Sequence, residues 1–238
     1  MGAGVVVLRE GFEASLVVGI VLAFLDRTGR RDGFLAVWIA VAAALALSLG
    51  VGIALFAAGA ELEGRSEAVF EGIVMLAAAG LLTWMIFWMR NRARTLRGEI
   101  EGRTQAALDA GSALGLGLVV FLGVAREGVE TALFLFSSVE GTNGLISLVA
   151  AIIGGVAAVG LGYLFYRGSH RLNLRAFFTA TSALLLVFAG YLLASGLHEL
   201  AEAGVIPESE VLLVVAFATF AAPTLYFFFR KPKQVATA

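Results

Sequence analysis

Long apolar stretches separated by short polar connections dominate the chain. Seven of them reach about 20 residues, the length that a helix needs to cross a bilayer. They cover residues 4–25, 34–58, 68–89, 112–137, 143–166, 175–198 and 211–229, and the longest connection between them is 90–111. The pattern predicts an all-α polytopic membrane protein with seven transmembrane helices, in one transmembrane domain over residues 1–238. The first helix has no basic residue before its apolar run, so we expect it to be retained rather than cleaved as a signal peptide.

The composition agrees with this class and excludes others. Of 238 residues, 60% are hydrophobic and 15% charged, with a mean hydropathy of +0.92. A soluble domain of this size has too little interior to bury so much apolar surface. The absence of cysteine and the presence of only two histidines exclude disulfides, thiolate metal sites and a histidine-rich zinc site. We expect no enzymatic activity, no nucleic-acid partner and no permanently bound cofactor.

Basic residues set the expected orientation, because cytoplasmic connections collect Lys and Arg. Fourteen of the 17 follow the first, third, fifth and seventh apolar stretches: Arg27, Arg30, Arg31, Arg90, Arg92, Arg94, Arg97, Arg103, Arg167, Arg171, Arg175, Arg230, Lys231 and Lys233. Arg65 is alone on the opposite side. We therefore expect the N-terminus outside and the C-terminus in the cytoplasm of a multi-pass protein of the cell (inner) membrane.

Charged residues also occur inside two of the apolar stretches. The first contains Arg9-Glu10-Gly11-Phe12-Glu13, and the fourth contains Arg126-Glu127-Gly128-Val129-Glu130. On a helix, the two carboxylates of each motif share a face, and the arginine can pair with the glutamate four residues on. A central Arg or Asp costs roughly 2.5–3.5 kcal/mol on insertion scales, so these groups need partners or a function.

The repetition of the motif is the stronger signal. The copies are 117 residues apart, and the three spans that separate their starts make the second run opposite to the first. Weaker matches are Gly50-Val51-Gly52 with Gly160-Leu161-Gly162, and Ala79-Gly80-Leu81-Leu82 with Ala189-Gly190-Tyr191-Leu192. We interpret residues 1–110 and 111–204 as two inverted three-helix repeats, with one extra helix and a cytoplasmic tail over 205–238. Inverted repeats with a site at the midplane are typical of transporters.

The motif side chains indicate the class of ligand. Glu10, Glu13, Glu127 and Glu130 make a hard oxygen site, and Arg9 and Arg126 compensate part of their charge. Such a site favours a multiply charged cation over an anion or a neutral solute, without choosing among Fe³⁺, Mn²⁺, Ca²⁺ and Mg²⁺.

A second acidic group is expected on the outer side. It consists of Glu67 and Glu71 at the start of the third stretch and of His198, Glu199 and Glu202 at the end of the sixth. It is either a solvated helix end or an entrance that concentrates cations above the buried carboxylates. The outer connections also carry Glu61, Glu63, Glu140, Glu208 and Glu210.

These residues match a known family over nearly the whole chain. The chain resembles the oxidase-dependent iron permeases, the family of the fungal high-affinity iron permease and of the bacterial iron/lead transporter type. Its hallmark is Arg-Glu-x-x-Glu in two spans, and further matches are Phe70-Glu71-Gly72, Leu82-Thr83-Trp84-Met85, Trp88-Met89, Phe177 to Ser182, His198-Glu199-Leu200 and Glu202-Ala203-Gly204.

The resemblance implies high-affinity uptake of iron as transported substrate. In the family, an external partner oxidises the iron, which is handed over as Fe³⁺. Fungal members use a multicopper ferroxidase, and bacterial relatives use a cupredoxin-like protein and a haem peroxidase. The lipid bilayer is the other expected partner, and the sequence leaves open whether the protein forms a homo-oligomer.

Two alternatives remain at the level of sequence. A proton-coupled transporter for another hard divalent cation fits the same carboxylates. A membrane carboxylate-metal oxidase fits less well, because di-iron bundles add Glu-x-x-His motifs that no span centre contains here.

Overall fold

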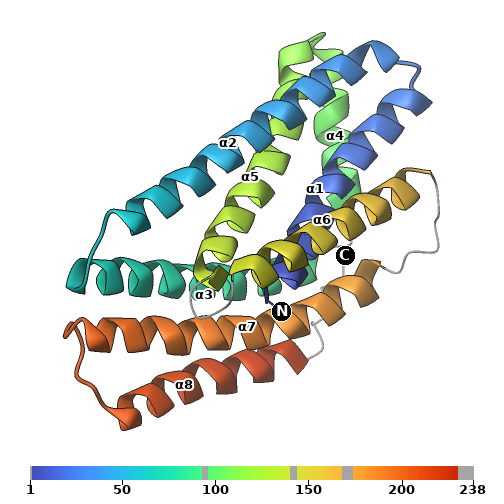
Figure 1. Cartoon of the computed structure of the whole chain (residues 1–238). Helices are drawn as coiled ribbons and strands as arrows, with labels where there is room; N and C mark the ends of the chain where they lie inside the picture. Colours follow the sequence, from blue (N-terminus) through green and yellow to red (C-terminus); the bar gives the residue numbers. More distant parts are fainter. Residues whose placement is uncertain (1, 93–95, 140–143, 168–173, 230–238) are drawn as a thin grey trace.

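The protein is all-helical over the residues that the computed structural model describes, which are 2–92, 96–139, 144–167 and 174–229 (Figure 1). Its helices are α1 Gly2–Arg27, the 3-10 helix η1 Arg31–Gly33, α2 Phe34–Ala60, α3 Arg65–Arg92, α4 Leu96–Asp109, α5 Ala113–Val139, α6 Gly144–Tyr166, α7 Leu174–Glu202 and α8 Glu210–Phe229. Each of the seven expected apolar stretches is a long helix. Five basic residues used for the orientation lie outside the described residues, as does Glu140 of the outer connections: Arg94, Arg171, Arg230, Lys231 and Lys233.

Most of the long helices are built to cross a bilayer. Four are long and apolar enough by composition alone: Arg31–Ala60, Arg65–Met89, Gly144–Tyr166 and Ala176–Glu202. α1 and α5 are as long, with 26 and 27 residues, but each carries three charged residues near its centre. At about 1.5 Å per residue, such a helix rises roughly 39 Å, more than the roughly 30 Å of a hydrocarbon core. Because the bilayer core offers no water to the backbone, a helix that bonds internally is the form these segments adopt.

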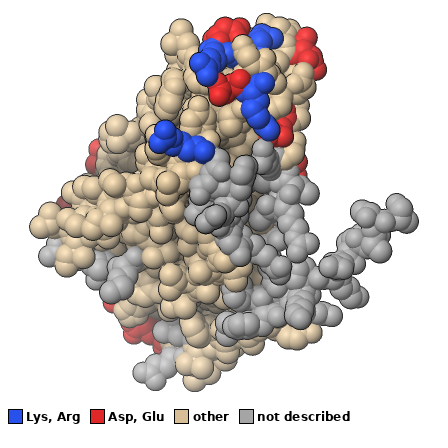
Figure 2. Space-filling model, turned by 90° about the vertical axis from the view of Figure 1, so that its right-hand side faces the viewer, with Lys and Arg blue, Asp and Glu red and all other residues tan. Residues whose placement is uncertain are grey.

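The outer surface of the bundle is apolar, as contact with lipid requires. Large hydrophobic side chains of α2 and α6 point outward, among them Leu49 at 66% and Val156 at 70% exposure. On the face drawn in Figure 2, most of the charged side chains gather at the upper end and a few acidic ones lie near the lower end, while most of the coloured surface between them is uncharged. The chain is a multi-pass membrane protein.

The main helix contacts join segments far apart in the sequence. α1 packs along α6, α2 along α5 and α3 along α7, while α1 also crosses α5. α1 and α6 run parallel, since Gly4 lies beside Ala150 and Gly11 beside Ala158. α2 and α5 run parallel too, because the contact of Ala36 with Gly117 is followed by that of Gly52 with Ala132.

α3 and α7 run antiparallel and approach closely. A Cβ on Gly72 would lie 2.9 Å from the Gly196 carbonyl oxygen and 2.8 Å from Leu200, and one on Gly196 would lie 3.1 Å from Leu76. Figure 1 shows these two helices side by side, with α8 against α7. This pair carries the residues of the expected outer acidic group at one end.

The sequence did not predict α4, which we expected to be part of a connection. It is too polar for a hydropathy scan to find, yet it has one buried face: Ile100 and Thr104 are 7% and 0% exposed. Ile100 joins a core cluster with α1, α2 and α5, and Arg27 Nη2 lies 2.6 Å from Glu101 Oε1. α4 therefore docks against the ends of α1 and α5 as an ordered helix.

Candidate metal site

The two charged motifs meet where α1 crosses α5. Glu10, Glu13, Glu127 and Glu130 are between 0% and 6% exposed, although each is ionisable. One carboxylate oxygen from each of Glu10, Glu127 and Glu130 lies within 4.8 Å of the others. Oxygens that bind one hard cation at 2.0–2.6 Å lie about 4–5 Å apart when they are on opposite sides of it. These three residues could therefore hold one ion between α1 and α5.

Glu13 is not one of these three residues, but it lies within electrostatic range of Glu127 and Glu130. Its Oε1 atom is 3.4 Å from Arg9 Nη2, and its side chain lines a cavity on one side of the group. A helix turns about 100° per residue, so Glu10 and Glu13 point in directions that differ by about 60°. The motif spacing thus allows either carboxylate, or both, to face the partner helix.

The two arginines are the internal counter-charges. Arg9 Nη1 lies 3.4 Å from Glu10 Oε1, and Arg9 is fully buried. Arg126 donates a hydrogen bond of 2.9 Å from Nε to Glu130 Oε1, lies 3.5 Å from Glu127 and is about one-third exposed. With four carboxylates and two guanidinium groups, the fully ionised set carries a net charge of −2.

The ion pairs leave part of the site without partners. The Oε2 atoms of Glu10, Glu127 and Glu130 are buried and accept no hydrogen bond from the residues that the structure describes. A buried unsatisfied polar group costs about 1–3 kcal/mol, and more when it is charged. A cation bound between these three carboxylates would offset their charge, so the donor set fits a hard metal ion as substrate.

Glycine allows the motif helices to approach their neighbours. A Cβ on Gly11 would lie 3.0 Å from the Ala158 side chain of α6. A Cβ on Gly128 would overlap the Ser48 side chain of α2, which leaves no space for it. The glycine between the glutamates of each motif therefore lets a supporting helix press against the back of the site.

The expected outer residues form a separate group at the α3–α7 end. His198 Nε2 and Glu202 Oε1 are 3.2 Å apart and both side chains are more than half exposed, while Glu199 is half-buried within electrostatic range of Glu67 and Glu71. The structure thus gathers all five residues of the outer group, apart from the three carboxylates at the helix crossing.

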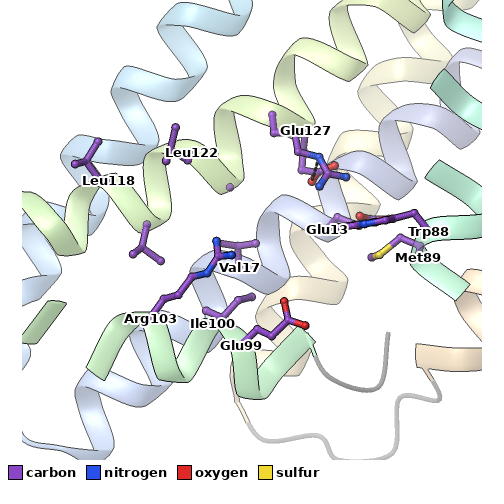
Figure 3. A pocket seen from close by; sticks show the side chains of 13 residues that line it. Glu13, Val17, Trp88, Met89, Glu99, Ile100, Arg103, Leu118, Leu122 and Glu127 are labelled. Atoms are coloured by element: carbon purple, nitrogen blue, oxygen red, sulfur yellow. Dashed lines mark ion pairs between the residues drawn. The ribbon is translucent and has the colours of Figure 1, made fainter. Parts of the chain in front are cut away.

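A cavity of about 370 Å³ borders the site on the side of α4 (Figure 3). Glu13, Arg126 and Glu127 line one part of it, and Glu99, Ile100 and Arg103 of α4 line another. Trp88, whose ring centroid is 4.5 Å from the Arg126 guanidinium carbon, lines it as well. The sequence did not lead us to expect Trp88 or α4 beside the site. The position of Trp88 next to a connection rich in arginine was the signal that could have indicated it.

A bundle of long apolar helices with ionisable side chains buried at its centre defines the class of membrane ion transporters. The chain belongs to the iron permease FTR1 family, whose model matches residues 1–208. This match confirms the resemblance seen in the sequence and indicates a transporter rather than an enzyme. The matched residues end before α8.

Curated relatives agree with the family. The chain is 40% identical over 201 residues to the ferrous iron permease EfeU of Escherichia coli O6:H1, an alignment that covers 84% of this chain and 73% of the relative. It is 36% identical over 201 residues to the ferrous iron permease EfeU of Yersinia pestis, with 84% and 71% of the two chains covered. No solved structure matches the chain.

Proposed function

We propose that this protein is an iron uptake permease of the cell (inner) membrane, and that the ion binds between α1 and α5 on the carboxylates of both motifs. The observation that carries the proposal is the group of Glu10, Glu127 and Glu130, whose oxygens lie within 4.8 Å of one another in a buried position. The family supports the identity of the ion as iron.

We propose further that residues 1–110 and 111–204 are inverted repeats and that 205–238 is an addition. If the two repeats are equivalent, α1 corresponds to α5, α2 to α6 and α3 to α7. The contact of α1 with α6 in one repeat pair then corresponds to the contact of α5 with α2, and both contacts are present. Contacts between single residues correspond in the same way. The contact of Gly11 with Ala158 corresponds to that of Gly128 with Ser48, and the contact of Gly162 with Ser15 corresponds to that of Gly52 with Ala132. This correspondence supports the repeat, and we propose that the metal site lies on its axis.

The helix directions support the alternation of spans that the proposed orientation requires. With the N-terminus outside and seven crossings, the first and fifth spans run inward and the second and fourth run outward. The parallel pairs α1–α6 and α2–α5, and the antiparallel pair α3–α7, are those that this alternation requires.

In the proposed mechanism, the outer group of Glu67, Glu71, His198, Glu199 and Glu202 collects the cation by its negative field. The ion then moves to Glu10, Glu127 and Glu130, with Glu13 as the next carboxylate on the path. Arg9 and Arg126 offset the carboxylate charge when no cation is bound, and Arg126 moves away as the cation binds. Relative motion of the repeats exposes the site to the cytoplasm.

For the transported species we propose Fe³⁺, delivered by an external iron oxidase. The resemblance to the oxidase-dependent permeases supports this species and such a partner. Fe²⁺ is the second candidate, because the curated relatives are named ferrous iron permeases. The oxidase partner, of the multicopper or the cupredoxin and haem peroxidase type, and a homo-oligomer stay predictions.

Uptake of labelled iron into proteoliposomes tests the function. We expect uptake by the wild type, no uptake by Glu130→Ala or Glu13→Ala with normal membrane insertion, and normal uptake by the exposed control Glu63→Ala. Separate assays with Fe³⁺ citrate and with Fe²⁺ under a reductant identify the oxidation state, and competition by Mn²⁺ and Ca²⁺ measures selectivity. Wild-type uptake by both site variants would overturn the proposed site.

A further inference from the structure

The cavity beside the site has a chemically mixed wall. Its lining includes five charged residues, Glu13, Glu99, Arg103, Arg126 and Glu127, together with apolar side chains of α1, α3 and α5. If acyl chains filled the cavity, each charged group in its wall would face lipid at a cost of several kcal/mol. The charged lining therefore argues against a lipid-filled groove. A cavity filled with water hydrates the same groups. The composition of the wall therefore favours water.

The cavity opens toward one side of the proposed membrane. α4 lies in the connection between the third and fourth spans, the segment richest in arginine, and Arg103 and Glu99 reach toward the cavity from it (Figure 3). The lining contains Glu13 and Glu127 of the motifs, but neither Glu71 nor Glu199 of the outer group. Among the described residues, the cavity thus joins the buried carboxylates to α4 and not to the outer group.

Arg126 stands between the carboxylates and this cavity. Its guanidinium group pairs with Glu130 and Glu127, packs against the Trp88 ring and forms part of the cavity wall. Arg9 is fully buried and does not line the cavity. Of the two motif arginines, Arg126 is therefore the one that can exchange between the carboxylates and water.

We propose that this cavity is a water-filled vestibule through which the cation leaves toward α4, and that Arg126, positioned by Trp88, takes the place of the departing cation on Glu127 and Glu130. The proposal rests on the proposed function for the nature of the cargo. The exchange keeps the local charge balanced, because one guanidinium group replaces part of the cation's charge on the same oxygens. Trp88 is a positioning residue, since it acts through Arg126.

Cysteine labelling tests the vestibule without any use of iron. The chain has no native cysteine, so each introduced thiol is unique. Leu118, 47% exposed on α5, lines the cavity, and Ile39, 60% exposed on α2, is the control. The two positions lie at similar depth, because Gly117 is next to Ala40 of α2. Leu118→Cys and Ile39→Cys are treated with a charged, membrane-impermeant thiol reagent in inside-out and in right-side-out vesicles.

We expect Leu118→Cys to react at least about tenfold faster than Ile39→Cys in inside-out vesicles, since an apolar environment suppresses the reactive thiolate by one or more pKa units. Equal slow rates at both positions would show that lipid fills the cavity, and faster reaction from the outer side would reverse its direction. Either result overturns the vestibule while leaving iron uptake to be judged by its own assay. If the labelling is as expected but the protein takes up no iron, only the proposed cargo is overturned.

Transport kinetics test the role of Trp88. Loss of a cation–π contact corresponds to roughly a 2- to 30-fold effect. We expect Trp88→Leu to lower the maximal uptake rate in that range with little change in KM, because the outer side of the path is untouched. Trp88→Phe should restore most of the rate, and Trp38→Leu on the lipid-facing side of α2 should leave it unchanged. An unchanged rate in Trp88→Leu, or an equal loss in Trp88→Phe, would overturn the positioning role.

Discussion

The motifs on α1 and α5 have the same pattern, Arg-Glu-x-x-Glu, but different surroundings. On α1, Arg9, Glu10 and Glu13 are enclosed by neighbouring helices, and the Nε and Nη2 atoms of Arg9 are buried without a hydrogen-bond partner among the described residues. On α5, Arg126 makes a good hydrogen bond to Glu130, packs on Trp88 and reaches the cavity. The arginine of the first motif is thus enclosed, whereas the arginine of the second motif reaches the cavity, which Glu13 and Glu127 also line.

The difference in surroundings gives the equivalent arginines of the two motifs different roles. A buried arginine between two buried carboxylates mainly prevents an uncompensated charge in the interior. An arginine at the boundary with water can leave and return at lower cost, because water hydrates it in the alternative position. We infer that Arg9 is chiefly structural and that Arg126 takes part in the transport cycle. The predictions below test this division, beginning with the largest expected effect.

Arg9→Met should destabilise the protein most. Removal of one partner from a buried ion pair costs about 3–5 kcal/mol, since the carboxylates keep their charge without compensation. We expect a large drop in the thermal unfolding temperature of the purified protein. The double variant Arg9→Met/Glu13→Gln removes one negative charge as well and should recover part of the loss. No recovery would show that Arg9 does not act by charge compensation.

Arg126→Met should disturb folding less and transport more. The side chain is about one-third exposed, so solvent screens its ion pairs in part. We expect an unfolding temperature well above that of Arg9→Met, with iron uptake strongly reduced. Arg126→Lys keeps the charge but not the planar fork, and should also transport poorly. If Arg9→Met and Arg126→Met lose the same amounts of stability and uptake, the two arginines do not differ as inferred.

Gly128→Ala should be more harmful than Gly11→Ala. The new methyl group overlaps Ser48 on α2 in the first case, whereas it lies 3.0 Å from the Ala158 Cβ atom in the second. Overpacking in a rigid interior costs about 1–3 kcal/mol. Ser48→Gly combined with Gly128→Ala should restore stability, measured by thermal unfolding, because it removes the colliding atoms. Equal effects of the two single variants would mean that the helices adjust freely at both motifs.

The seven long helices could be predicted from the sequence, because an apolar stretch that crosses a bilayer has few structural choices. The meeting of the motifs followed from their repetition. Which three of the four carboxylates lie within 4.8 Å of one another could not be predicted, since this depends on how α1 is rotated against α5. The docking of α4 depends on a few buried residues such as Ile100, which a hydropathy scan does not detect. The contrast between Arg9 and Arg126 arises from neighbours distant in sequence, such as Trp88.

The smallest effect is expected in the outer group. His198 Nε2 and Glu202 Oε1 lie 3.2 Å apart, and their side chains are 59% and 54% exposed. Exposed pairs contribute about 0–1 kcal/mol, so His198→Ala should leave the unfolding temperature nearly unchanged. Glu199→Gln should reduce uptake moderately at low iron and low salt, and the difference should shrink as salt screens the outer field. A complete loss of uptake in Glu199→Gln would make this group part of the binding site itself.

The central claim is that the two motifs form one site rather than two, and iron-binding stoichiometry tests it most directly. Purified wild type, Glu10→Gln on α1, Glu127→Gln on α5 and the exposed control Glu63→Gln are titrated with iron. The account predicts one tightly bound ion per chain in the wild type and in the control, and loss of that ion in either motif variant. Two ions in the wild type, with one retained in each motif variant, would contradict it.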